Sequence, residues 1–326
     1  MSRNSSARSF ALVLSGAAFI ISTAASAQDW PNKAVRMIVP FGTGGGTDIQ
    51  ARLLADSFRQ STGQTFITDN RSGAGGTIGA EIVAQAPPDG YTILFTTASL
   101  AVNTTLFSKS LKFDPRKDLL PISLVSSTPL VLCTHPSVPA KSVKELVSLA
   151  KKNPGKLNHG VNSAGTTSHL AAELMKQRAG LDTVIIAFKG GGPAAAALMT
   201  GEIDMLFATG PVAARNLATG RIKCLAVASP KKASAFPDLP TVASSIPDFA
   251  ADNWYAMFFP KGTPQEFATK MYGAIKKALS EPKIAKFYKQ EGLEPIAGPA
   301  SELQQVFERD IQKYAEVIKR ANIRVQ

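Results

Sequence analysis

From about residue 35 onward, apolar positions along the chain follow two alternating periods. Short runs rich in β-branched residues predict buried strands at 35–40, 66–68, 91–96, 156–161, 184–188, 204–208 and 223–228. Most of these runs are followed by a stretch whose apolar residues recur at helical spacing. This alternation predicts an α/β fold with largely parallel sheets and helices on both faces.

Two of the expected helices begin with a recognisable capping signal. Residues 47–50 read Thr-Asp-Ile-Gln and are expected to form a capping box for a helix that runs to about Gln60. Residues 142–145 read Ser-Val-Lys-Glu and predict a second box, for a helix that runs to about Lys152.

Two segments share the order strand, proline loop and helix, and they indicate how the chain is divided. One runs from Leu130 through Pro139, and the other runs from Ala256 through Pro264. A chain that leaves one lobe for a second and then returns needs two such crossing strands. We therefore expect residues 28–126 and 250–326 to form lobe 1 and residues 127–249 to form lobe 2.

The first 27 residues have the pattern of a secretory signal peptide. Arg3 and Arg8 supply positive charge, residues 10–22 are apolar without a charge, and residues 25–27 read Ala-Ser-Ala, a small-residue cleavage site. The apolar run is shorter than the roughly 18 residues that a membrane span requires, and no later stretch reaches that length. We expect an exported protein that works in the periplasm after cleavage.

Charge and cysteine content exclude several classes of function. The formal net charge is +12, but lysine and arginine occur in ones and twos, so nucleic acid is not an expected partner. Cys133 and Cys224 lie in strand-like runs; the periplasm permits a disulfide between them, but two small buried hydrophobes are the preferred interpretation. Two cysteines and three scattered histidines have no metal-ligand spacing, so neither a metal nor a cofactor is expected.

Four loops rich in Gly, Ser and Thr lead from expected strands into expected helices, at residues 41–48, 72–77, 163–169 and 189–193. In a parallel α/β sheet such loops lie at the carboxyl edge, where ligands bind. Each loop ends at a helix N-terminus, whose free N–H groups attract carboxylate or phosphate. Four such loops in one chain favour an anion-binding cleft over ordinary tight connections.

The motifs of common enzymes are missing from the chain. Residues 73–78 have isoleucine where G-x-G-x-x-G requires its last glycine, and no P-loop, G-x-S-x-G or H-E-x-x-H motif occurs. Ser168 and His169 are adjacent at an expected helix start and point in different directions, so we expect a hydrogen-bonding or capping histidine. A binding protein without catalytic residues is expected, and a secreted hydrolase that uses Ser168 and His169 is the competing class.

A series of short motifs follows a characteristic order: Trp30-Pro31, Val39-Pro40-Phe41, Gly44-Gly45, Thr47-Asp48, Asn70-Arg71, Gly73-Ala74-Gly75-Gly76, Pro88-Asp89-Gly90-Tyr91, Thr167-Ser168-His169, Lys189-Gly190 and Leu239-Pro240-Thr241. Their order and spacing resemble the substrate-binding receptors of tripartite tricarboxylate transporters, the Bug or TctC-type proteins, over the whole mature chain. The resemblance implies a type II periplasmic-binding-protein fold with two lobes, a hinge and an interlobe ligand cleft. It also implies a small organic carboxylate ligand, a membrane permease of this transporter type as partner, and a monomer. A sensor subunit that presents ligand to a signalling receptor is the alternative.

The resemblance also places the first loop and the loop at 163–169 around one carboxylate of the ligand. The expected ligand-binding residues are Phe41, Thr43, Gly44, Gly45, Gly46, Asp48, Ser99, Asn162, Ser163, Thr166, Thr167, Ser168, His169, Lys189, Gly190 and Thr209. The chain departs from the family pattern at Phe188, where tyrosine is common, and at Ala208-Thr209, where the strand often ends in aspartate. Because this aspartate is missing, we expect a ligand without a positively charged amine.

Overall fold

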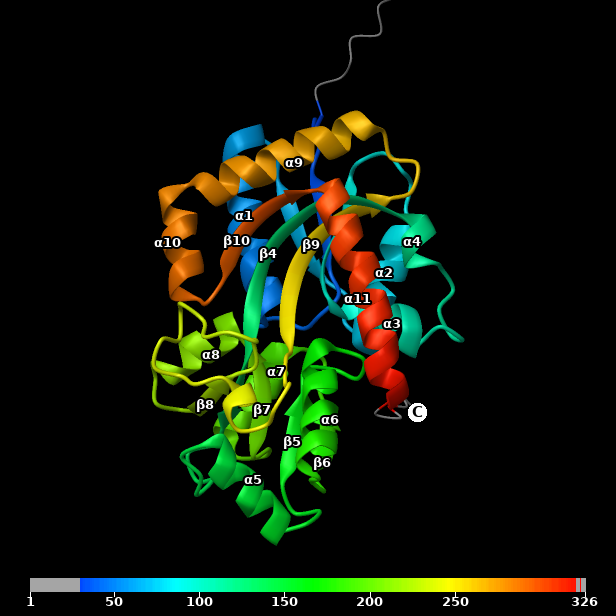
Figure 1. The fold of residues 1–326 in the computed structure, drawn as a ribbon. Helices are drawn as coiled ribbons and strands as arrows, with labels where there is room; N and C mark the ends of the chain where they lie inside the picture. The colour runs from blue at the N-terminus through cyan, green and yellow to red at the C-terminus, as the bar shows by residue number, and fades with distance from the viewer. Residues whose placement is uncertain (1–29, 321–322, 324–326) are drawn as a thin grey trace, which may run out of the picture.

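The computed structural model describes residues 30–320 and residue 323 (Figure 1). The expected signal peptide lies outside these residues. The strands are β1 (Val35–Val39), β2 (Phe66–Asn70), β3 (Thr92–Thr97), β4 (Leu119–Thr134), β5 (Asn158–Val161), β6 (Val184–Ala187), β7 (Met205–Thr209), β8 (Lys223–Val227), β9 (Asp252–Pro260) and β10 (Glu294–Pro299). The helices are α1 (Gly46–Thr62), α2 (Thr77–Ala84), α3 (Ser99–Leu106), α4 (Pro115–Asp118), α5 (Val143–Lys152), α6 (Thr167–Ala179), α7 (Gly191–Thr200), α8 (Gly210–Leu217), α9 (Gln265–Ser280), α10 (Pro282–Gln290) and α11 (Ala300–Arg320), with short 3-10 turns η1 (Ala74–Gly76) and η2 (Val242–Ser244).

The strands follow the order β2-β1-β3-β9-β4-β7-β5-β6, and β10 and β8 also pair with β4. The α/β class and all seven predicted strands are confirmed, but the expectation of largely parallel sheets is only half right. β1 is parallel to β2 and β3, and β5 is parallel to β6 and β7, whereas every pairing of β4 and β9 is antiparallel. The physical reason is that the strand that leaves lobe 1 and the strand that returns to it must run in opposite directions.

The long strand β4 connects the two parts of the molecule, as Figure 1 shows. Residues 119–129 of β4 pair with β9, whereas residues 130–134 pair with β7 and β8. The chain returns at the start of β9, where the N–H of Ala251 donates to the carbonyl of Ala228 at 2.8 Å. We propose that residues 28–126 and 250–326 form lobe 1 and that residues 127–249 form lobe 2.

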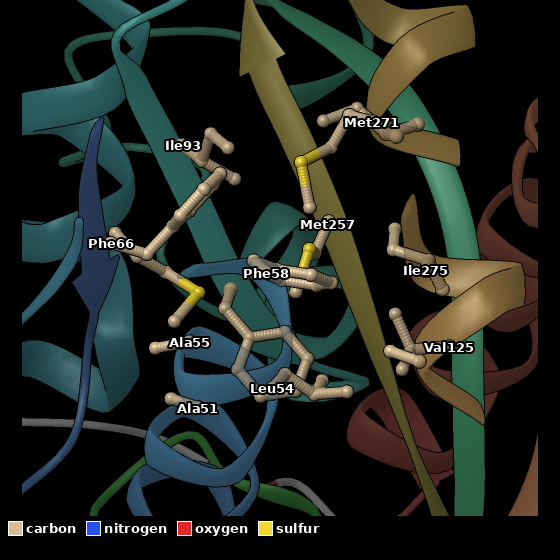
Figure 2. Close-up of a cluster of buried hydrophobic side chains, with 14 of the residues drawn as sticks. Ala51, Leu54, Ala55, Phe58, Phe66, Ile93, Val125, Met257, Met271 and Ile275 are labelled. Carbon is tan, nitrogen blue, oxygen red and sulfur yellow. The ribbon is translucent and has the colours of Figure 1, made fainter. Parts of the chain in front are cut away.

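Both faces of each sheet region are covered by helices, as expected. In lobe 1, α1, α9 and α10 cover one face, while α2, α3 and α11 cover the other. Figure 2 shows the first of these cores, in which Leu54 and Phe58 of α1 and Met271 of α9 pack against Met257 of β9. In lobe 2, α5 and α6 cover one face, and α7 and α8 cover the other. The apolar helix faces read from the sequence are therefore the faces that build the cores.

Of the two predicted capping boxes, the one at Ser142 is confirmed in its N-cap, although its reciprocal bond goes to the N–H of Lys141 and not to that of Ser142. The side chain of Ser142 accepts a hydrogen bond from the N–H of Glu145 at 3.2 Å, and the Glu145 carboxylate accepts one from the N–H of Lys141 at 2.8 Å. The box at Thr47 is wrong: α1 begins at Gly46, and its N-cap residue Gly45 makes no side-chain cap. The pattern misled because Gln50 binds elsewhere, donating to the Gly46 carbonyl at 3.3 Å and accepting from Ser126 of β4 at 2.7 Å.

Cys133 and Cys224 form a disulfide between β4 and β8. The two residues face each other in the antiparallel register of these strands. The expectation of two unpaired small hydrophobes is therefore wrong. The pairing joins strands that are 91 residues apart in the chain, so local pattern gave no sign of it.

His159 on β5 is buried in lobe 2 and stacks on Phe207, with ring centroids 5.5 Å apart. Within the described part of the chain its Nε2 atom has no hydrogen-bond partner. Burial lowers the pKa of His159 from 6.5 to about 3, so the folded protein keeps this ring neutral where the unfolded chain protonates it.

The stability that His159 contributes at neutral pH should therefore be lost as the pH falls from 6.5 towards 3. We expect the loss to reach about 3 kcal/mol between pH 7 and pH 4. Urea unfolding at a series of pH values measures it, with His159→Leu as the variant that cannot titrate. An equal acid slope in the variant and the parent would contradict the prediction.

Candidate functional site

A small pocket lies between the lobes, at the carboxyl ends of strands from both. It is lined by Phe41, Gly45, Gly46, Thr47, Thr97, Ser99, Asn162, Thr166, Thr167, Gly191, Thr209 and Asn253. Its volume is about 20 Å³, room for about one water molecule. Every lining side chain is uncharged, so any charge on a ligand must be balanced by backbone groups and hydroxyls.

Four helices begin at this pocket. α1 and α3 start at Gly46 and Ser99 in lobe 1, and α6 and α7 start at Thr167 and Gly191 in lobe 2. The first N–H groups of a helix have no partner within their own helix and carry a partial positive charge. Because the four N-termini come from both lobes, an anion in the pocket would be held from two sides.

The side chain of Asp48 stabilises the conformation of the first loop, residues 41–48. Its carboxylate accepts a hydrogen bond from the N–H of Gly44 at 2.9 Å and forms an ion pair with Arg52 at 2.9 Å. Burial alone would raise the pKa of Asp48, but the hydrogen bonds from Arg52 and Gly44 outweigh burial and hold the pKa below its usual range. Asp48 therefore braces the glycine-rich turn and does not line the pocket.

The loop at 163–169 is held in its conformation by hydrogen bonds between its own side chains and backbone. Thr166 donates from its hydroxyl to the carbonyl of Ser163 at 2.7 Å and caps α6 by accepting from the N–H of His169 at 3.4 Å. The N–H of Gly165 donates to Nδ1 of His169 at 3.1 Å. The expectation that His169 is a hydrogen-bonding residue agrees with this geometry.

Ser168 and His169 each have separate partners. The buried hydroxyl of Ser168 donates to the carbonyl of Phe207 at 3.0 Å, while Nε2 of His169 lies 3.7 Å from the carboxylate of Glu173. The hydrogen bond with His169 lowers the pKa of Glu173, although burial opposes it. This arrangement does not present the serine to a histidine base, as nucleophilic catalysis would require.

The two lobes touch beside the pocket. The N–H of Gly42 in lobe 1 donates to the carbonyl of Lys189 in lobe 2 at 2.8 Å, next to a bond within lobe 2 in which the N–H of Gly190 donates to the carbonyl of Asn162 at 2.7 Å. A Cβ atom at Gly192 would collide with the carbonyl oxygen of Thr43. Only glycine therefore permits this approach of the two backbones.

Half of the sixteen expected ligand-binding residues line the pocket: Phe41, Gly45, Gly46, Ser99, Asn162, Thr166, Thr167 and Thr209. The other eight lie around it. Thr43, Gly44, Lys189 and Gly190 belong to the loops that meet between the lobes, and the Lys189 side chain is exposed. Asp48, Ser163, Ser168 and His169 hold the loops in shape, as described above.

The loop at 72–77 was expected to share in anion binding, but its residues do not line the pocket. Gly75 is held by Asn103, whose side-chain amide donates to its carbonyl at 2.7 Å. A Cβ atom there would lie 2.5 Å from the carbonyl oxygen of Ala164 in lobe 2. This loop is a second place where the lobes approach each other.

Sequence reasoning missed four lining residues, namely Thr47, Thr97, Gly191 and Asn253. Thr47 and Gly191 lie inside the loops that were singled out, and Thr97 directly follows the strand predicted at 91–96, so the signal for these three was present. Asn253 had none. It is the second residue of β9, and because β9 runs antiparallel to β3, the first residues of β9 lie at the edge where β3 ends.

Two further properties concern the described residues as a whole. Across residues 30–320 and 323, no helix is long and apolar enough to cross a membrane. In the same part of the chain, no group of three or more His, Cys, Asp or Glu side chains is placed to hold a metal ion.

Comparisons with known proteins agree with this architecture. A model of the protein family described as "Tripartite tricarboxylate transporter family receptor" matches residues 50–323. Protein BugT of Bordetella pertussis is 32% identical over 309 residues, which cover 94% of each chain.

Two solved structures of similar proteins contain carboxylates. A protein of R. palustris described with adipate is 33% identical, with a TM-score of 0.88 over 91% of this chain and 99% of that chain. MatC from Rhodopseudomonas palustris, with bound malate, is 29% identical, with a TM-score of 0.84 over 88% of this chain and 99% of that chain. The chain belongs to the tripartite tricarboxylate transporter receptor family, whose members are two-lobed periplasmic solute-binding proteins.

Proposed function

We propose that this protein is an extracytoplasmic receptor that binds a small organic carboxylate and delivers it to a membrane permease of the tripartite tricarboxylate transporter type. The observation that carries the proposal is the meeting of four helix N-termini, two from each lobe, at a pocket with uncharged hydroxyl, amide and glycine lining. Such ends stabilise a carboxylate without a cationic side chain. The adipate and malate held by similar proteins support the same ligand class.

Ligand entry and release would require the lobes to separate. The pocket volume of about 20 Å³ is too small for a carboxylate of several carbons, and the loops on either side touch. A carboxylate that contacts helix N-termini from both lobes binds the closed arrangement better than the open one, so it shifts the population towards closure. The closed monomer would then be the form that the permease recognises.

The place of action follows from the family and the N-terminal pattern. Receptors of this family are periplasmic, and residues 1–27 have the layout of a signal peptide. We propose export, cleavage after Ala27 and a periplasmic receptor. Mass spectrometry of the protein from a periplasmic fraction would show the mature N-terminus at Gln28; an uncleaved chain would contradict this part of the proposal.

The proposed ligand has no positively charged amine. Thr209 ends β7 where an aspartate would offer a counter-ion, and no carboxylate lines the pocket. An ammonium group buried here would lose its hydration without a charged partner, which is costly. Amino acids should therefore bind at least about tenfold more weakly than carboxylates of the same size.

A thermal-shift screen of the mature protein against mono-, di- and tricarboxylates and amino acids tests the proposal. A ligand at about 100 times its Kd should add about 2.7 kcal/mol to the free energy of unfolding and raise Tm by several degrees. We expect a shift with one class of carboxylate and a clearly smaller one with amino acids of the same size at the same concentration.

Two outcomes would count against the proposal. A shift with amino acids alone would contradict the inference, drawn from Thr209, that the ligand has no positively charged amine. If nothing shifts Tm, the protein should be denatured and its supernatant examined by mass spectrometry for a ligand retained through purification. The absence of any carboxylate there as well would contradict the receptor proposal.

A further inference from the structure

Three buried polar atoms next to the pocket make no hydrogen bond of good geometry within the described residues, although the Tyr255 hydroxyl lies near the side chains of Thr209 and Asn253. They are Oδ1 of Asn162, Oγ1 of Thr209 and the hydroxyl of Tyr255. Tyr255 is fully buried, and the other two residues are less than one-tenth exposed. Buried polar groups are normally paired, so a cluster of unpaired ones beside a pocket requires an explanation.

The two hydroxyls converge on the start of α1. A Cβ atom built on Gly46 would lie 2.5 Å from the hydroxyl of Tyr255 and 2.7 Å from Oγ1 of Thr209. Tyr255 comes from β9 and Thr209 from the end of β7, so they approach Gly46 from different lobes. Gly46 and Thr209 both line the pocket, and only a glycine at position 46 lets the two hydroxyls lie this close to the backbone of the first loop.

The third atom lies on the lobe 2 side of the same pocket. Oδ1 of Asn162 is 3.5 Å from the position that a Cβ atom would occupy on Gly191, another lining residue. The Gly191 position is also close to the first loop, because a Cβ atom on Gly45 would lie 3.3 Å from the Gly191 nitrogen. Asn162, Thr209 and Gly46 all line the pocket, and the Tyr255 hydroxyl lies against Gly46, so the three atoms are gathered around the pocket at the junction of the lobes.

The hydrogen-bonding capacity of the three atoms determines which ligand group can pair with all of them. Burial raises the pKa of Tyr255 far above its usual value, so this hydroxyl stays neutral and can donate or accept, as the hydroxyl of Thr209 can. An amide oxygen such as Oδ1 of Asn162 only accepts. A carboxylate also only accepts and would leave that oxygen unpaired, whereas an alcohol accepts from one partner and donates to another.

We propose that Thr209, Tyr255 and Asn162 form a subsite for a hydroxyl group on the ligand, so that the ligand is a hydroxy-substituted carboxylate. The inference rests on the proposed carboxylate-receptor function and narrows its ligand class. The helix N-termini hold the carboxylate, and the subsite distinguishes the hydroxy acid from the acid that lacks the hydroxyl. A site built to bond a hydroxyl rejects the analogue without it, because the buried partners then remain unpaired.

The test is isothermal titration of the mature receptor with matched pairs of acids: lactate and propionate, malate and succinate, and 2-hydroxyglutarate and glutarate. In at least one pair the hydroxy acid should bind about tenfold or more tightly than its partner. Thr209→Val and Tyr255→Phe should each weaken the hydroxy acid by about tenfold and leave the partner acid within about twofold of its original affinity.

The chain offers a matched control for each variant. Thr183→Val and Tyr288→Phe also remove a buried hydroxyl without a hydrogen-bond partner, but neither residue lines the pocket. Both controls should bind every acid as the parent does. All four changes keep the shape of the side chain, and urea unfolding verifies that each variant is folded.

The outcomes separate this inference from the function on which it rests. If carboxylates bind but no pair shows preference for the hydroxy acid, the subsite is overturned and the receptor proposal stands. If Thr209→Val weakens the binding of both members of a pair equally, the Thr209 hydroxyl bonds to the carboxylate or to an ordered water. The subsite is then overturned as well. If no acid of either kind binds, the receptor proposal itself fails.

Discussion

Replacing Gly192 with alanine is expected to weaken ligand binding by at least about 100-fold while leaving the fold intact. The new Cβ atom would collide with the carbonyl oxygen of Thr43 and would lie 3.2 Å from the nitrogen of Gly45, both on the opposite lobe. These are backbone atoms, which cannot move aside as the end of a flexible side chain can. The clash exists only where the lobes meet, so it raises the free energy of the closed arrangement and leaves the separated lobes unaffected. A 100-fold loss corresponds to about 2.7 kcal/mol.

The control for this variant is Gly273→Ala on α9, where a Cβ atom would meet nothing within 4 Å. Isothermal titration measures the affinity, and small-angle scattering measures whether ligand still makes the protein more compact. Gly273→Ala should behave as the parent does, whereas Gly192→Ala should bind weakly and stay open. Parental affinity in Gly192→Ala would show that the contact between the two glycine loops is not needed for binding.

Removing the disulfide by the double change Cys133→Ala and Cys224→Ala is expected to reduce the free energy of unfolding by about 2–5 kcal/mol. The bond closes a long loop, because its two cysteines are 91 residues apart in the chain. Without it, the unfolded chain gains conformational freedom, while the folded state loses one covalent link between β4 and β8. Both cysteines are buried in the α7 and α8 core, so the change to alanine also removes some packing.

Urea unfolding of the double variant and of the reduced parent measures this effect, and the two should have similar midpoints below that of the oxidised parent. Ligand affinity should change by less than about threefold, since neither cysteine lines the pocket. Equal midpoints for the double variant and the oxidised parent would contradict the prediction.

Much of the local structure could be read from the sequence because its signals are local. β-branched runs marked the strands that became β1 to β3 and β5 to β8, and helical periodicity marked the faces that pack on them. β10 was not predicted, because residues 294–299 contain two prolines and a glycine and have no clear strand period. It exists because it pairs with β4.

The candidate site was partly readable for the same reason. Gly, Ser and Thr gather where strands lead into helices, and three of the four loops chosen on this basis contribute to the pocket. The function of individual residues was less readable. Asp48 and Ser168 have the polarity of ligand-binding residues, but their side chains bond to Gly44 and Phe207 of this chain.

The sequence by itself determined the α/β class, the order of elements, the glycine-rich loops and the family, because each of these depends on neighbouring residues or on motif order. Only the tertiary structure decided which loops meet between the lobes, that Cys133 joins Cys224, that Asn253 lines the pocket and that Tyr255 lies against Gly46. These features depend on which distant strands lie side by side and in which direction they run. The physical reason is that strand pairing is a contact between segments far apart in the chain, so no local pattern of apolar and polar residues specifies it.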